Sequence, residues 1–271
     1  MPSVLTVTRW EARKLVSQKR TYLGLAAAVG APLLFVGALA VQNGAPTDEP
    51  FGASVRSSGL AIPLLMLVFG SIWLFPLIAA LVAGDIVASE DQNGTLKTIL
   101  TRSLNRGHIF AGKVVVAVAY ATFAITLMVV TAIAAGSIQS GFNPLRTLTG
   151  TEVSAGRATL LVFVSLAVYL MPLAAVVAIG VMLSTLTRNS AGAVVGTLML
   201  SLLMQLIGVL PGFGGVRPYL LTTQFDAWQG LLREPIDTAP IVHAAWICPL
   251  YAVPALAIAY IVFQRRDVAG G

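Results

Sequence analysis

Six long runs of apolar residues dominate the sequence. They cover about residues 22–41, 60–84, 114–138, 159–186, 191–210 and 243–263. A hydrocarbon core of about 30 Å is crossed by about 20 helical residues, and each run reaches that length. Only 10% of the residues are charged, compared with roughly 25% in a soluble domain. Because helices satisfy their own backbone polar groups in lipid, we expect an all-α integral membrane protein with six transmembrane helices.

None of the six runs contains Asp, Glu, Lys or Arg. Ion-driven transporters and voltage sensors keep ionisable groups at membrane depth, because those groups handle the charge. Asp85 and Lys113 stand at the ends of runs, where long side chains can reach the headgroup region, so we expect them to anchor the helices. If such a bundle moves a compound, its energy comes from a partner.

Basic residues are distributed unevenly between the polar segments. The N-terminus, the 85–113 loop, the 188–190 loop and the C-terminus hold 12 of the 17 Lys and Arg residues. Such an excess marks the cytoplasmic side of a membrane protein. We therefore expect a multi-pass protein of the cytoplasmic (inner) membrane with both termini in the cytoplasm. The placement between apolar runs also indicates that the net charge of +6 serves topology and not nucleic-acid binding.

Residues 4–20 form a basic segment with helical amphipathicity. The basic stripe contains Arg9, Arg13 and Arg20, and the apolar stripe contains Leu5, Ala12 and Val16. Trp10 suits the headgroup level. We expect a helix lying on the cytoplasmic surface of the membrane, with a solvated tail as the alternative. Ala38-Leu39-Ala40 would suit signal-peptide cleavage, but the apolar run before it exceeds the ~7–15 residues of a signal sequence.

The loop at residues 85–113 is the most informative polar segment. It is much longer than the ~2–8 residues that join adjacent helices. Asn93-Gly94 can end one short helix, and Thr95 can cap the next. Leu96, Ile99 and Leu100 then form a short apolar face. A small amphipathic helix in a cytoplasmic loop suits docking into the groove of a soluble partner, with a surface-lying linker as the alternative.

Several sequence patterns resemble catalytic or ligand-binding motifs but lack residues that those motifs need. Residues 107–113 have the Gly-x-x-x-x-Gly-Lys spacing of a phosphate-binding loop, but Val114 follows where Ser or Thr is needed for magnesium. His108 and His243 are far apart, and no His-Glu-x-x-His motif occurs. The single cysteine, Cys248, lies in an apolar run and excludes a disulfide within the chain. We therefore expect no catalytic, cofactor or metal site, and no enzyme.

The long loop also carries a sequence motif. It reads Glu-x-x-x-Gly-Thr-Leu-Lys-x-x-Leu followed by Arg and Lys, at Glu90, Gly94, Thr95, Leu96, Lys97, Leu100, Arg106 and Lys113. This pattern resembles the permease subunits of ABC-2-type ATP-binding cassette transporters, between their second and third spans. The N-terminal helix resembles their elbow helix, and residues 211–240 resemble their re-entrant segment before the last span. Ser103-Leu104-Asn105-Arg106 departs from the family, which often has Pro before its Ser-Arg pair.

The resemblance implies one ABC-2-type transmembrane domain over residues 1–271 and a set of partners. Two permease copies or homologues would pair, and ABC ATPase subunits, which hold ATP and Mg, would dock below them. The ATPase-coupling residues would be Asp85, Glu90, Asp91, Gly94, Thr95, Leu96, Lys97, Leu100 and Arg106. The second and fifth spans would line the transport path. On the fifth span, Gly192 and Gly196 suit close helix packing, within the chain or at the path, and Ser201 and Gln205 could face the path.

The leading functional hypothesis is a permease subunit of an efflux transporter. Its apolar, charge-free spans suit an amphiphilic or hydrophobic compound such as a drug, an antibiotic or a small peptide, carried among membrane lipids. The second hypothesis is a membrane scaffold that docks a cytoplasmic partner without transporting anything. An intramembrane enzyme ranks lowest, because no pair of buried polar groups can be named.

Overall fold

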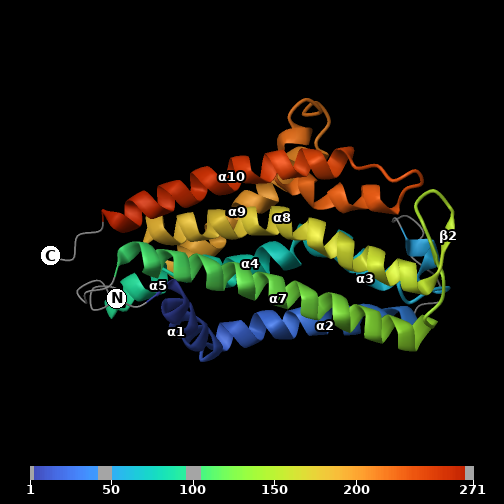
Figure 1. The fold of residues 1–271 in the computed structure, drawn as a ribbon, viewed down its shortest axis with the longest axis horizontal. Helices are drawn as coiled ribbons and strands as arrows, with labels where there is room; N and C mark the ends of the chain where they lie inside the picture. The colour runs from blue at the N-terminus through green and yellow to red at the C-terminus, as the bar shows by residue number, and fades with distance from the viewer. Residues whose placement is uncertain (1–2, 42–50, 96–104, 266–271) are drawn as a thin grey trace.

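The computed structural model describes residues 3–41, 51–95 and 105–265, which form an elongated helical bundle (Figure 1). The helices are α1 (Val4–Val16), α2 (Lys19–Val41), α3 (Ala61–Ile72), α4 (Leu74–Ala83), α5 (Ala88–Gln92), α7 (Arg106–Ser140), α8 (Ala155–Thr187), α9 (Ser190–Val209) and α10 (Ala239–Gln264). Short 3-10 helices are η1 (Gly52–Ser54), η2 (Arg217–Tyr219) and η3 (Thr222–Leu232), and two strands are β1 (Leu145–Arg146) and β2 (Glu152–Val153). The class predicted from the apolar runs, a helical membrane protein, is confirmed.

The bundle has two chemically different ends. Helices α1 and α5 and the close of α10 lie at one end, which we call the α5 end (Figure 1). The antiparallel β1–β2 hairpin, with Leu145 opposite Val153, lies at the other, the hairpin end. The long helices run between the two ends.

Five helices in the described ranges are long and apolar enough to cross a membrane: α2, α7, α8, α9 and α10. A sixth crossing exists only if α3 and α4, which meet at 60°, are counted together. The expected second span, 60–84, is therefore not one helix. The third span also differs from the prediction, because α7 begins at Arg106 and not near Val114.

Pro76 explains the break between α3 and α4. It stands four residues after Ile72, where α3 ends. A proline cannot donate to the carbonyl four residues earlier, and its ring clashes with that carbonyl. Near the break, Ser71 Oγ donates to Val68 O at 2.7 Å, and the buried Tyr169 hydroxyl of α8 donates to Leu67 O at 3.2 Å. Side chains thus bind carbonyls next to the interruption, as irregular backbone at membrane depth requires.

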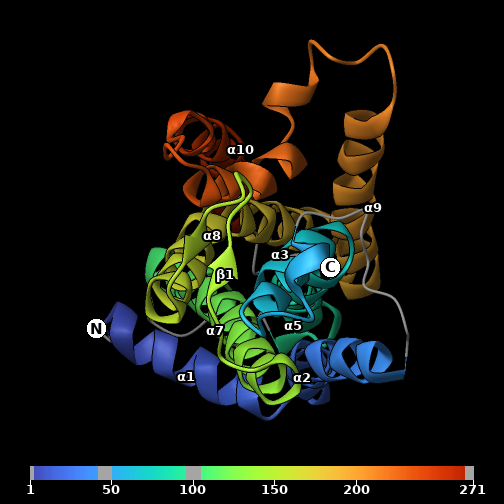
Figure 2. The same ribbon diagram turned by 90° about the vertical axis from the view of Figure 1, so that its right-hand side faces the viewer.

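The N-terminal segment is two helices, because α1 ends at Val16 and α2 begins at Lys19. The α1 helix packs against α7, and Figure 2 shows it along one side of the bundle. Leu5 and Val16 of the expected apolar stripe are 62% and 59% exposed, which leaves them available to a membrane surface. Val7 is instead the buried apolar residue of α1. The inner face of α1 also carries charged residues, described below.

The segment after α9 is exposed and then folds back. Residues 209–219 are exposed, and Figure 2 shows the chain leaving α9 at the side of the bundle. Within residues 211–240, which resemble a re-entrant segment in sequence, the structure has the 3-10 helices η2 and η3, and η3 packs against α8 and α10. The hairpin in the expected 139–157 loop was not predicted. It is tied to η3 because Leu148 N donates to Leu232 O at 3.0 Å.

Two glycines allow α3 and α7 to meet backbone to backbone at the hairpin end. A Cβ atom on Gly59 would collide with the backbone of Gly136, and one on Gly136 would lie 3.1 Å from the carbonyl carbon of Gly59. Beside them, Gly59 N donates to Gly141 O at 3.0 Å, and Ser58 Oγ donates to Asn143 O at 2.8 Å. The end of α7 is thereby fixed against the start of α3.

We predict that Gly136→Ala lowers the free energy of unfolding by about 1–3 kcal/mol, the usual cost of overpacking. Thermal unfolding of the purified protein in detergent micelles measures the change. Gly30→Ala in α2 is the matched control, because a Cβ atom there meets nothing within 4 Å. It should unfold at the wild-type temperature or slightly above. Equal stability of the two variants would contradict a tight contact.

Candidate functional site

A fully buried lysine organises the α5 end. Lys113 lies eight residues into α7, and its side chain is 0% exposed. Its ammonium group lies 2.7 Å from Glu90 Oε1 and 2.8 Å from Glu11 Oε1, and it donates to Ile86 O at 3.1 Å. These three acceptors match the three donors of an ammonium group. Lys113 is therefore enclosed by the protein and does not begin a helix as expected.

Glu90 on α5 joins two lysines. Its side chain is 1% exposed, and Oε1 pairs with both Lys113 and Lys14 of α1. Burial raises the pKa of Glu90, but the positive charges of Lys113 and Lys14 outweigh it, so the pKa lies below its ordinary value of 4.5. Among the described residues, Glu90 Oε2 is buried without a hydrogen-bond partner. The carboxylate is thus held as an anion inside the protein.

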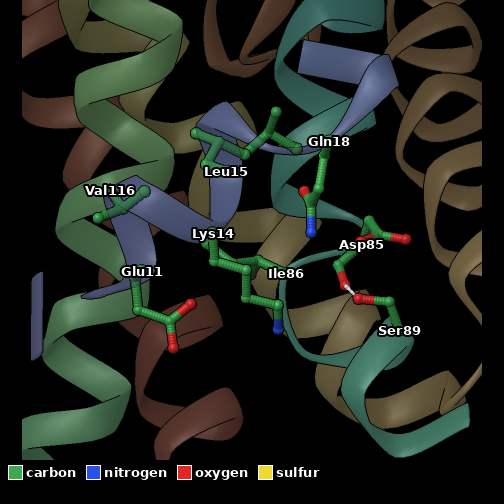
Figure 3. A pocket seen from close by; sticks show the side chains of 9 residues that line it. Glu11, Lys14, Leu15, Gln18, Asp85, Ile86, Ser89 and Val116 are labelled. Carbon is green, nitrogen blue, oxygen red and sulfur yellow. Dashed lines mark hydrogen bonds between the residues drawn. The ribbon is translucent and has the colours of Figure 1, made fainter. Parts of the chain in front are cut away.

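The four side chains come from three elements and balance in charge. Glu11 and Lys14 lie on the same face of α1 as Val7, at helical spacing. Figure 3 shows Glu11 and Lys14 pointing toward the segment that carries Asp85 and Ile86, with a small cleft between them. Two lysines and two glutamates leave no net charge in this network. We call Glu11, Lys14, Glu90 and Lys113 the ionic cluster.

A second set of contacts fixes the start of α5. Asp85 is 3% exposed and pairs with Arg20 of α2 and with the hydroxyl of Ser190 at the start of α9. The buried Ser184 Oγ of α8 accepts from Val87 N at 3.1 Å and from Ala88 N at 3.0 Å. Asp85 is therefore enclosed by the protein, and its side chain is not free to anchor a helix in the headgroup region as expected. It ties the approach to α5 to two other helices.

The exposed part of α5 and its exit lie beyond these contacts. Asp91 is 3.7 Å from Arg188, and Thr95 Oγ1 donates to Glu90 O at 3.2 Å. Gly94 has φ +67°, a conformation that favours glycine, and a Cβ atom there would meet nothing within 4 Å. Gly94 and Thr95 are exposed. The expected coupling residues Leu96, Lys97 and Leu100 lie outside the described residues.

The remaining predicted residues lie elsewhere. Arg106 starts α7 and donates to Gln264 O at 2.7 Å, at the close of α10. On α9, the nearest atoms to a Cβ atom on Gly192 would be those of its own cap residue, Asn189, at 3.7 Å, whereas a Cβ atom on Gly196 would lie 3.3 Å from Leu183. Ser201 is buried and donates to Thr197 O at 3.0 Å within α9, and Gln205 is half-buried. The structure does not bring these residues together with α5.

Sequence reasoning missed most of the residues that hold the site. Glu11, Lys14, Arg20 and Ser184 were not singled out as partners, and Lys113 was given the wrong environment. One sequence signal was available. Glu11 and Lys14 share a helix face with the apolar Val7, so charged side chains lie on a face that also carries a core residue. Within the described ranges no group of three or more His, Cys, Asp or Glu residues could hold a metal ion.

The fold and the ionic cluster define a multi-pass helical membrane protein with an internally neutralised charge network at one end. A family model described as protein of unknown function (DUF2705) matches residues 36–269. The chain belongs to this DUF2705 family. A search of curated proteins finds no match to the chain.

We predict that Glu90→Gln lowers the free energy of unfolding by roughly 3–5 kcal/mol, because it leaves an uncompensated lysine in a buried cluster. Thermal or urea unfolding in micelles measures the loss. The control is Glu152→Gln, since Glu152 is 70% exposed and 3.9 Å from Arg146. That change should cost about 0–1 kcal/mol.

The pH dependence of the free energy of unfolding tests the ion pairs of Glu90 independently. Because the folded-state pKa of Glu90 is lowered, its contribution is complete above the unfolded-state pKa and is lost as pH falls through the folded-state value. Wild-type protein should therefore lose stability below about pH 4.5, and Glu90→Gln should flatten that part of the curve. Parallel curves for the two proteins would contradict the pairing.

Proposed function

We propose that this chain is the membrane-spanning permease subunit of an ATP-driven exporter and draws its energy from a separate ABC ATPase. The observation that carries the proposal is the ionic cluster, which joins the short α5 to α1 and α7. A partner that displaces α5 would have to move these helices with it or break buried ion pairs. The α5 end would face the cytoplasm of the inner membrane.

The predicted coupling residues fall into a buried group and an exposed group, and each group would have a different role. Glu90 and Asp85 are too buried to touch an ATPase, so their part in coupling would be to hold α5 in place. Gly94 and Thr95, which are exposed, would lie at the contact surface. Rigid-body movement of the attached helices would then alternate access to the transport path.

Two features support an amphiphilic or hydrophobic cargo and a second permease copy. A groove of about 540 Å³ lies between α2 and the α3–α4 break, and its lining includes Phe35, Phe69 and Trp73. Its volume is in the range of about 300–1,000 Å³ that small-molecule sites have. Only 17% of the apolar window of α9 is buried within the chain. That leaves most of α9 for lipid or for a second permease.

The test uses the permease purified with an ABC ATPase encoded beside it. We predict that Gly94→Val lowers permease-dependent ATP hydrolysis and export at least several-fold, because valine is strained at positive φ and would reshape the exit from α5. Gly150→Val is the matched control, since Gly150 also has positive φ, with open space around it, at the hairpin end. It should leave both activities unchanged.

The same experiment distinguishes the permease hypothesis from the scaffold hypothesis. If the chain is a scaffold, the partner binds but neither its ATP hydrolysis nor export depends on Gly94. If no ATPase copurifies under any condition, the permease proposal fails.

Cysteine labelling tests the orientation. Cys248 is 3% exposed and can be replaced by alanine to give a cysteine-free background. We predict that Thr95→Cys, at the α5 end, reacts with a membrane-impermeant maleimide only after cells are opened. Thr151→Cys, an exposed position at the hairpin end, should react in intact spheroplasts. The reverse pattern would place the α5 end outside and exclude coupling to a cytoplasmic ATPase.

A further inference from the structure

A second site lies far from the ionic cluster. The helices η2 and η3 and the first turns of α10 enclose an open pocket of about 600 Å³. Its polar lining includes Arg217, Gln224, Asp226, Gln229, Arg233 and His243. The membrane runs lack charged residues, so this concentration of charge is unusual for the chain.

The geometry of η3 builds one wall of the pocket. In a 3-10 helix, side chains three residues apart lie above one another. Thr223, Asp226 and Gln229 are spaced by three and all line the pocket. Phe225 and Trp228 point into the protein instead, and the Phe225 ring lies 4.8 Å from that of Tyr169 on α8. The helix thus turns a polar stripe toward the pocket and an apolar side toward the core.

Gln224 is a buried residue of the pocket lining that determines which ring nitrogen of His243 donates a hydrogen bond. The Gln224 amide is 4% exposed and donates to Pro218 O at 2.7 Å and to Leu220 O at 2.9 Å. Both hydrogens of the amide nitrogen are used, so Oε1 faces His243 Nδ1 at 3.4 Å as an acceptor. His243 Nδ1 is therefore the donor, and Nε2 is left as the acceptor of the neutral ring.

The charged side chains of the lining are Arg217, Asp226, Arg233 and Asp237, all within the described chain, and they form no ion pair with one another. Asp237 Oδ1 accepts from Ala239 N at 3.0 Å, at the start of α10. Among the described residues, no carboxylate oxygen lies within 4.0 Å of the guanidinium of Arg217 or Arg233. Asp226 Oδ1 accepts from Gln229 Nε2 at 3.1 Å, and burial raises the pKa of this carboxyl above its ordinary value although the positive charge of Arg217 opposes the rise. Two guanidinium forks suit a phosphate or carboxylate group, and a carboxylate suits an amine.

Apolar residues stand beside the pocket in the same segment. Phe213 is 46% exposed and Val216 is 49% exposed, directly before Arg217. A ligand whose charged head enters the pocket would find apolar surface next to it for an alkyl or side-chain tail.

We propose that this pocket binds the head of a zwitterionic amphiphile. Arg217 and Arg233 bind its anionic group, Asp226 binds its amine, and the apolar residues before Arg217 contact its tail. The molecule could be a bilayer phospholipid with an amine-bearing head or a freely diffusing amphiphilic compound. The inference concerns binding alone and does not depend on an ATPase.

The experiment measures binding of lysophosphatidylethanolamine to the full chain in nanodiscs made of phosphatidylglycerol. Lysophosphatidylglycerol of the same chain length, which lacks the amine, is the comparison ligand. Radiolabelled ligand and filtration give the dissociation constants. The variants are Arg217→Gln, Arg233→Gln and Asp226→Asn. Arg146→Gln is the control, because Arg146 is 65% exposed at the hairpin end and outside the pocket.

Each arginine variant should weaken binding of both ligands by about tenfold or more, since a hydrogen bond between charged groups is lost. Asp226→Asn should weaken the amine-bearing ligand by a similar factor and leave the other unchanged. Arg146→Gln should bind like wild type. Wild-type affinity in both arginine variants, or an equal loss in Arg146→Gln, would overturn the proposal.

A second nanodisc composition identifies the source of the ligand. If bilayer phosphatidylethanolamine occupies the pocket, changing the nanodisc lipid to it abolishes binding of the labelled probe. If the probe binds with unchanged affinity, the pocket accepts a freely diffusing amphiphile and excludes bilayer lipid. Either result supports a zwitterion site, whereas wild-type affinity of Asp226→Asn for the amine-bearing ligand in phosphatidylglycerol nanodiscs contradicts it.

Discussion

The burial of the Lys113 ammonium group constrains the whole α5 end. An isolated ammonium group in an apolar bundle costs several kcal/mol, so its position on α7 is tenable only with carboxylates beside it. Glu90 comes from α5 and Glu11 from α1, which places both elements against α7. Lys14 then balances the second glutamate. Helices α1, α5 and α7 are thus fixed to one another by one electrostatic requirement.

The two ends of the bundle are held together by different interactions. The α5 end depends on ion pairs, which are directional and costly to break singly. The hairpin end depends on close glycine contacts and on aromatic packing, such as the stacking of Phe51 on Trp228 at 6.2 Å. A displacement of α5 would therefore have to break a few ion pairs. A displacement at the hairpin end would instead have to disturb many packing contacts at once.

Much of the fold follows from the sequence, because apolar runs of membrane length leave few alternatives to helices. The long polar loop and the exposed Gly94 could also be anticipated from turn chemistry. The start of α7 was missed because the predicted span was drawn from the apolar run alone, which begins after Lys113. Gly112 allows α1 to approach, since a Cβ atom there would lie 2.8 Å from Val7 Cγ1. The partners of Lys113 were not predictable, because periodicity shows which residues share a face but not which distant helix covers that face.

Helix α8 gives the two sites a physical connection. Its Ser184 binds the backbone at the start of α5, and its Tyr169 contacts Phe225 of η3 and Phe75 of α4. These two α8 residues are fifteen positions apart on one continuous helix, or about 22 Å at 1.5 Å per residue. A force that moves α5 would reach both the α3–α4 break and the wall of the η3 pocket through this helix. Coupling of this kind needs an element that contacts both sites, and α8, which contains Pro172 between these two residues, contacts one site through hydrogen bonds and the other through aromatic packing.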